Sequence, residues 1–151
     1  MNILVVCHGN VCRSPLAEVV LRKNLPKTAI VSAGFAGPNR PAAKKVREYA
    51  MRHDYDLSQH RSKVVTQEQL QKSDLILYMD NRNLEGLRQM SCDIRKTMSL
   101  GSLVDVDRIQ DPAYIPRGKK LDNILGTIEQ ACKNLAAFIT KKDPRFSTRV
   151  Y

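Results

Sequence analysis

Short apolar runs alternate along the chain with segments whose apolar residues recur at helical spacing. Residues 2–6, 28–33 and 74–79 are short, apolar and partly β-branched, which predicts three buried strands. A weaker fourth strand is expected over residues 96–100. The clearest helix covers residues 121–139, where apolar side chains recur at i, i+3, i+4 and i+7.

The segments between the strands carry the signals of further helices. Ser14 and Pro15 are expected to cap and begin a helix that ends before Pro26. Thr66 with Gln69 resembles a capping box. Three further elements complete the pattern: a loop marked by Gly37, Pro38 and Pro41, a helix face of Ala42, Ala43, Val46, Tyr49 and Ala50, and a helix through Leu84 and Leu87.

Strands that alternate with helices predict an α/β fold with a parallel sheet covered on both faces. Right-handed connections then give a doubly wound sheet, which binds ligands beyond the carboxyl ends of its strands. The chain has 151 residues, which suits a single domain over residues 1–151. Residues 141–151 form a basic tail that we expect to be loosely ordered.

Composition narrows the choice of partners. The net charge of +10 favours anions, but only 5% of the residues are aromatic and no recognition motif occurs, so we expect no nucleic acid partner. No apolar run approaches the roughly 20 residues that span a bilayer, and the start lacks a basic leader. We therefore expect a cytoplasmic protein without membrane contact. The four cysteines contain no CxxC pair, which argues against a zinc site.

The loop after the first strand carries the candidate chemistry. It reads CHGNVCRS from Cys7 to Ser14, between a strand and the start of a helix. Its amides can form a cradle for an anion, helped by the helix N-terminus, by the conformational freedom of Gly9 and by the planar fork of Arg13. A thiol in these surroundings ionises easily, so Cys7 is the candidate nucleophile. A cysteine six residues before an arginine is common by chance, and it is the strand–loop–helix setting that favours a functional loop.

Residues 6–15 (VCHGNVCRSP) closely resemble the signature of the low-molecular-weight protein tyrosine phosphatases. Further matches follow in the same order: SAG at 32–34, SQHRS at 58–62, MD at 79–80 with NL at 83–84, and DP at 111–112. The resemblance extends to about Ile139. It implies a four-stranded parallel sheet in the flavodoxin-like order 2-1-3-4, a phosphocysteine intermediate, and neither a metal nor another cofactor.

The resemblance also implies roles for individual residues. Asp111 matches the general acid, which protonates the tyrosine leaving group and then deprotonates the attacking water. His60 matches a histidine of the supporting hydrogen-bond network, and oxidation of Cys7 with Cys12 is expected to give a reversible disulfide. The phosphate-binding loop comprises His8, Gly9, Asn10, Val11, Cys12 and Ser14.

The substrate pocket departs from the family pattern. We expect Val11, Phe35 and Tyr114 to enclose the substrate ring, but Ala113 replaces one aromatic residue and the loop over residues 35–40 is short. The pocket is therefore expected to be shallower and weaker for phosphotyrosine. Protein arginine phosphatases of this fold carry threonine at the position of Val11, so valine favours a tyrosine-type substrate.

Three alternatives to a tyrosine phosphatase stay open from the sequence. These are a protein arginine phosphatase, a thioredoxin-coupled arsenate reductase, which needs two further thiols, and a catalytically silent module that binds phosphoproteins. For the favoured function the partner is a tyrosine-phosphorylated protein, for which a bacterial tyrosine kinase is one candidate, and inorganic phosphate is the product.

Overall fold

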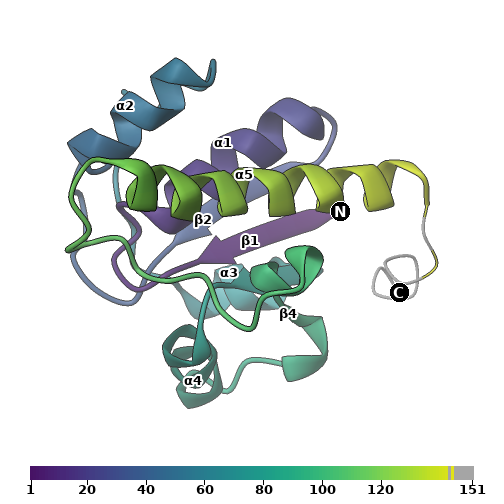
Figure 1. Ribbon diagram of the computed structural model, residues 1–151. Helices are drawn as coiled ribbons and strands as arrows, with labels where there is room; N and C mark the ends of the chain where they lie inside the picture. Colours follow the sequence, from purple (N-terminus) through teal and green to yellow (C-terminus); the bar gives the residue numbers. More distant parts are fainter. Residues whose placement is uncertain (143, 145–151) are drawn as a thin grey trace.

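Four parallel strands form the centre of the computed structural model, which describes residues 1–142 and 144 (Figure 1). The elements in chain order are β1 (Asn2–Val6), α1 (Arg13–Asn24), β2 (Ala29–Ala33), α2 (Lys44–Arg52), α3 (Gln67–Lys72), β3 (Leu75–Tyr78), α4 (Asn81–Gln89), η1 (Ile94–Lys96), β4 (Thr97–Ser99), η2 (Leu100–Val104) and α5 (Lys119–Thr140). The tail expected over residues 141–151 lies, except for 141, 142 and 144, outside the described residues.

The strand order is β2-β1-β3-β4, which confirms the predicted order 2-1-3-4. In β1, Leu4 lies opposite Val31 of β2 and Ile76 of β3, both in parallel pairing. β1 is therefore an inner strand, and its carboxyl end is flanked by β2 and β3. The loop that follows it lies at the edge where doubly wound sheets bind ligands.

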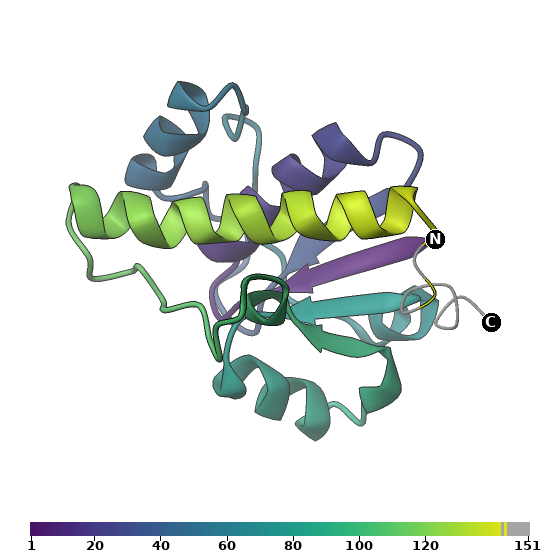
Figure 2. The same cartoon turned by 45° about the vertical axis from the view of Figure 1, so that its right-hand side comes forward.

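Alternate residues of β1 supply two separate cores. Ile3 and Val5 join the larger apolar cluster with residues of α1, α2 and α5, whereas Leu4 and Val6 join a smaller cluster with residues of α3 and α4. Figure 2 shows α5 lying across one face of the sheet and α4 below its other side. Burial on both faces explains why β1 is apolar from Ile3 to Val6 and does not alternate.

Helix capping follows the sequence prediction at one position and departs from it at another. The Thr66 hydroxyl accepts from the Gln69 N–H while the Gln69 side chain accepts from the Thr66 N–H, which confirms the capping box. The prediction of Ser14 as a helix cap is wrong. Helix α1 begins at Arg13, its N-cap residue Cys12 makes no side-chain cap bond, and the Ser14 hydroxyl is directed at Cys7 instead.

Helix α5 is the longest helix, with 22 residues, and it covers the larger core. Cys132 on its inner face is fully buried, as its apolar surroundings in the sequence predicted. Within residues 1–142 and 144, no helix combines the length and the apolar character needed to cross a bilayer.

Candidate active site

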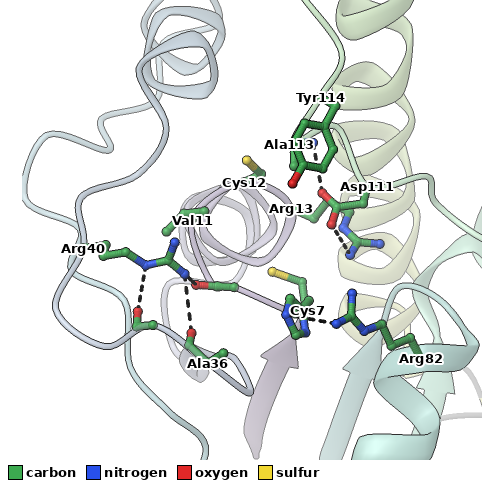
Figure 3. Close-up of a pocket in the computed structure, with 13 residues that line it drawn as sticks. Cys7, Val11, Cys12, Arg13, Ala36, Arg40, Arg82, Asp111, Ala113 and Tyr114 are labelled. Atoms are coloured by element: carbon green, nitrogen blue, oxygen red, sulfur yellow. Dashed lines mark hydrogen bonds and ion pairs between the residues drawn. The ribbon is translucent and has the colours of Figure 1, made fainter.

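A cavity of about 560 Å³ opens at the carboxyl end of β1 (Figure 3). Its walls come from the loop between β1 and α1, the segment after β2, the start of α4, and the segment that precedes α5. The figure shows Cys7 between Val11 and Arg40 on one side and Asp111, Ala113 and Tyr114 on another. Residues far apart in sequence thus meet around one cysteine.

Cys7 lies at the base of this cavity with 3% of its surface exposed. Its Sγ is hydrogen bonded to the Ser14 hydroxyl at 3.0 Å and accepts a longer bond from the Ser14 backbone N–H at 3.5 Å. Ser14 belongs to the first turn of α1, so the sulfur also faces the positive end of a helix dipole. Each of these contacts directs a hydrogen-bond donor or a positive dipole end at the sulfur.

Asn10 holds the curl of the loop. Its backbone has φ of 55°, in the left-handed region that asparagine tolerates better than most residues. Its fully buried amide donates to the hydroxyls of Ser14 (2.8 Å) and Ser32 (2.9 Å) and accepts from the Lys63 N–H (3.0 Å). Because the Ser14 oxygen accepts from Asn10, its proton is available for the sulfur of Cys7.

His60 joins this network from a distant segment. Its Nε2 lies 2.7 Å from the Asn10 carbonyl oxygen. Burial lowers the pKa of His60 by disfavouring the charged ring, although the bond to the carbonyl opposes that effect. A neutral ring that donates from Nε2 satisfies both conditions.

Arg13 is buried, with 1% exposed, yet its guanidinium reaches the cavity. Its Nη1 donates to Asp80 Oδ2 at 2.7 Å and to the Ile109 carbonyl at 2.8 Å. Burial opposes ionisation of Asp80, but the bonds from Arg13 and from the Asn83 N–H together hold the pKa of Asp80 below its usual value. The ion pair with Asp80 orients the Arg13 guanidinium, although removing both charges from water opposes its formation.

Asp111 lies beside Arg13 at the cavity opening. Its Oδ2 is 3.6 Å from Arg13 Nη2, its side chain is 43% exposed, and its Oδ1 accepts from the Ala113 N–H at 3.0 Å. The loop that carries it is tied to α2, because Lys45 Nζ donates to the carbonyls of Pro112 (2.5 Å), Ala113 (3.0 Å) and Ile115 (2.7 Å).

The residues expected around the substrate ring are only partly brought together. Val11 and Tyr114 line the cavity, and Tyr114 is 97% exposed, so its ring covers little of it. Phe35 lies elsewhere. It packs with the smaller core against Gly86 of α4 and borders a neighbouring depression. The expectation that Phe35 lines the Cys7 cavity is therefore wrong, because the smaller core offers its ring a better-packed position.

Two cations at the cavity were not identified from the sequence. Arg40 donates to the carbonyls of Gly9 (3.1 Å) and Gly37 (3.0 Å) and so links the loop after β2 to the Cys7 loop. Arg82 Nη2 lies 3.3 Å from His8 Nε2. Arg40 lies outside the matched motifs, and Arg82 lies between MD at 79–80 and NL at 83–84 without being part of either, so the motifs alone gave neither residue a place at the cavity.

The other three thiols lie in different surroundings from Cys7. Cys12 lines the cavity with 6% exposed, and burial, reinforced by the neighbouring Cys7, raises its pKa to about 11. Cys92 packs against the smaller core and Cys132 lies in the larger one, on opposite faces of the sheet. All four cysteines, which lie within the described residues, are free thiols. In the same part of the chain, no three His, Cys, Asp or Glu side chains gather as metal ligands.

Comparison with known proteins agrees with this geometry. The profile of the family "Low molecular weight phosphotyrosine protein phosphatase" matches residues 2–145. The low molecular weight protein-tyrosine-phosphatase Etp of Escherichia coli K12 is 33% identical over 142 residues, which cover 93% of this chain and 95% of Etp.

Two solved structures are also similar. The tyrosine phosphatase Wzb from E. coli K30, in complex with sulphate, superposes with a TM-score of 0.84 at 33% identity, covering 91% of this chain and 97% of Wzb. The YwlE arginine phosphatase of Geobacillus stearothermophilus gives a TM-score of 0.83 at 26% identity, covering 95% and 96%. The chain belongs to the low molecular weight phosphotyrosine protein phosphatase family.

Proposed function

We propose that this chain hydrolyses phosphotyrosine in proteins, with Cys7 as nucleophile, Arg13 as phosphate ligand and Asp111 as general acid and base. The observation that carries the proposal is the position of Cys7 Sγ, hydrogen bonded to Ser14 at 3.0 Å beneath a cavity that Arg13 and Asp111 also line. The remaining geometry supports a role for each group in two steps.

In the first step the Cys7 sulfur attacks phosphorus and a sulfur–phosphorus bond forms. The bond from phosphorus to the phenolic oxygen breaks, and that oxygen takes a proton from the Asp111 carboxyl. Since Arg13 Nη1 is held by Asp80 and Ile109, we assign Nε and Nη2 to two non-bridging phosphate oxygens. The Asp111 side chain is 43% exposed, which leaves it accessible to the leaving group.

In the second step water attacks the phosphocysteine. The Asp111 carboxylate, now deprotonated, takes a proton from the water, the sulfur–phosphorus bond breaks, and inorganic phosphate leaves. The Cys7 thiolate is regenerated, and the bond from the Ser14 hydroxyl stabilises its charge. No redox change occurs in either step.

Phosphotyrosine is the substrate that the cavity favours. Val11 offers an apolar wall without a hydroxyl, and Tyr114 supplies an aromatic ring at the opening. We propose a tyrosine-phosphorylated protein as partner, with a tyrosine kinase as one candidate. We also propose the cytoplasm as the compartment, because a nucleophilic thiol is preserved in reducing surroundings.

The experiment compares wild type with Cys7→Ser on p-nitrophenyl phosphate and on a phosphotyrosine peptide. Wild type should turn over both substrates, and Cys7→Ser should lose at least about 10³-fold in kcat. Cys92→Ser, at a thiol outside the cavity, is the matched control and should keep wild-type activity. A phosphocysteine trapped by rapid acid quench should be present in wild type and absent in Cys7→Ser.

Parallel assays separate the alternatives. Faster turnover of a phosphoarginine peptide than of the phosphotyrosine peptide would make the chain an arginine phosphatase. Arsenate-dependent oxidation of thioredoxin would make it a reductase, although Cys92 and Cys132 on opposite faces of the sheet do not favour a thiol relay. Phosphopeptide binding without turnover would indicate a silent module.

A further inference from the structure

A second depression, of about 600 Å³, lies directly beside the Cys7 cavity. It is open to solvent and lies between the start of the phosphate loop, the segment after Ser62, and α4. Nothing in the proposed reaction uses it. It is lined by His8, Phe35, Val64, Val65, Arg82, Glu85, Gly86, Gln89 and Met90.

The two depressions share a wall. His8 and Arg82 line both of them, and these two side chains approach each other to 3.3 Å. Figure 3 shows Arg82 near Cys7, at the edge of the catalytic cavity. A polypeptide whose phosphotyrosine occupies the first depression can therefore extend into the second.

The floor of the second depression is apolar and held in place. Phe35 packs so closely on α4 that a Cβ built at Gly86 would come within 2.8 Å of its ring. Val64 is 42% exposed although the segment around it is fixed, because the Val65 N–H donates to the Gly34 carbonyl and the Gly34 N–H donates to the Lys63 carbonyl, each at 2.8 Å. A rigid, partly exposed apolar surface binds without a large ordering cost.

We propose that this depression binds an apolar side chain of the substrate polypeptide, one or two residues from the phosphotyrosine. The inference rests on the proposed function. Continuity with the catalytic cavity supports the choice of occupant, because each residue of an extended peptide advances by about 3.3 Å and neighbouring side chains fall within reach of the shared wall. The depression thereby selects among phosphotyrosine sites, whereas the Cys7 cavity recognises the phosphorylated ring common to all of them.

The test uses phosphotyrosine peptides that differ only at one position. Leu or Ser is placed in turn at −2, −1, +1 and +2 from the phosphotyrosine, and kcat/KM is measured for each peptide, with p-nitrophenyl phosphate as the substrate too small to reach the second depression. We expect kcat/KM to be about fivefold higher with Leu than with Ser at one or two positions. A closed apolar pocket would discriminate more strongly, but this site is open to solvent.

Two variants assign the preference to this surface. Val64→Asn makes the floor polar and Gln89→Trp fills the depression from an exposed helix position, so each should bring the Leu/Ser ratio close to one and leave p-nitrophenyl phosphate turnover unchanged. Ile94→Asn is the matched control, because Ile94 is 40% exposed and precedes β4 at the opposite edge of the sheet. It should preserve the ratio.

The inference is overturned if wild type shows no preference at any of the four positions, or if the preference survives in both Val64→Asn and Gln89→Trp. If wild type does not hydrolyse p-nitrophenyl phosphate, the proposed function is refuted instead. The two failures are therefore distinguishable.

Discussion

Gly34 directly follows β2 and supports the catalytic loop from behind. A Cβ built on it would lie 2.8 Å from the His8 carbonyl oxygen, 2.9 Å from the Asn10 nitrogen and 3.0 Å from the Asn10 Cβ. On its other side, the backbone of Gly34 is bonded to Lys63 and Val65. The substitution Gly34→Ala therefore adds one methyl group between two fixed segments.

The size of the effect follows from these distances. Ordinary contact begins at 3.4 Å, so the loop has to move by about 0.6 Å (3.4 minus 2.8) to accept the methyl group. Overpacking of this kind costs about 1–3 kcal/mol, which for a domain of this size lowers Tm by roughly 2–12 °C. A displacement of about half an ångström under the nucleophile should lower kcat roughly tenfold.

The assay pairs thermal unfolding with p-nitrophenyl phosphate kinetics. Gly126→Ala is the control, since a Cβ there meets only the Tyr49 hydroxyl, at 3.6 Å, within helix α5. It should leave kcat unchanged and raise stability by about 0.5–1 kcal/mol. If Gly34→Ala kept both the Tm and the kcat of wild type, the close contact between Gly34 and the catalytic loop would not exist in solution.

Three further predictions test other parts of the site and fold. Asp111→Asn should lower kcat about 10²-fold for phosphotyrosine but much less for p-nitrophenyl phosphate, which has the better leaving group. The variant should still bind phosphate. Equal losses of kcat on both substrates would count against a role of Asp111 as general acid. Lys45→Met should release the Asp111 loop and lower kcat roughly tenfold with the same dependence on the leaving group, and an unchanged kcat would show that this tether is dispensable. Glu129 is buried, which raises its pKa, but bonds from Lys133, Tyr49 and Tyr55 outweigh burial and hold the pKa below 4.5. Its contribution to stability is therefore complete above about pH 4.5 and is lost as the pH falls through the folded-state pKa. Glu129→Gln should lower the free energy of unfolding in urea by about 1.5–3 kcal/mol at pH 7. It should also weaken the fall of that free energy at acid pH, and an unchanged pH dependence would contradict this prediction.

The elements that could be predicted from the sequence are those whose cause is local. The strands follow from short apolar runs, and the capping box of Thr66 and Gln69 requires only residues three apart. The strand order rested on the family resemblance, since pattern alone does not select which strands pair. The position of Cys7 was predictable because strand, loop and helix are contiguous.

The features that the sequence did not reveal depend on tertiary contacts. Ser14 has the composition of a helix cap, but a buried sulfur competes for its hydroxyl and wins. Phe35 was expected at the substrate because of its place in a loop, yet Gly86 on α4 opens a space that its ring fills. Lys45 contacts carbonyls 67 to 70 residues away, and no local pattern indicates such a contact.

Residues 105–118 contain neither helix nor strand. Surface segments of that kind usually drift freely in length during evolution, because lengthening them costs the fold little. Here one such segment supplies both the Ile109 carbonyl that fixes Arg13 and the Asp111 carboxylate that faces it. A single residue inserted between Ile109 and Asp111 would leave the sheet intact, but the Ile109 carbonyl and the Asp111 carboxylate could no longer both contact Arg13. In this region, relatives should therefore vary in residue type far more readily than in length.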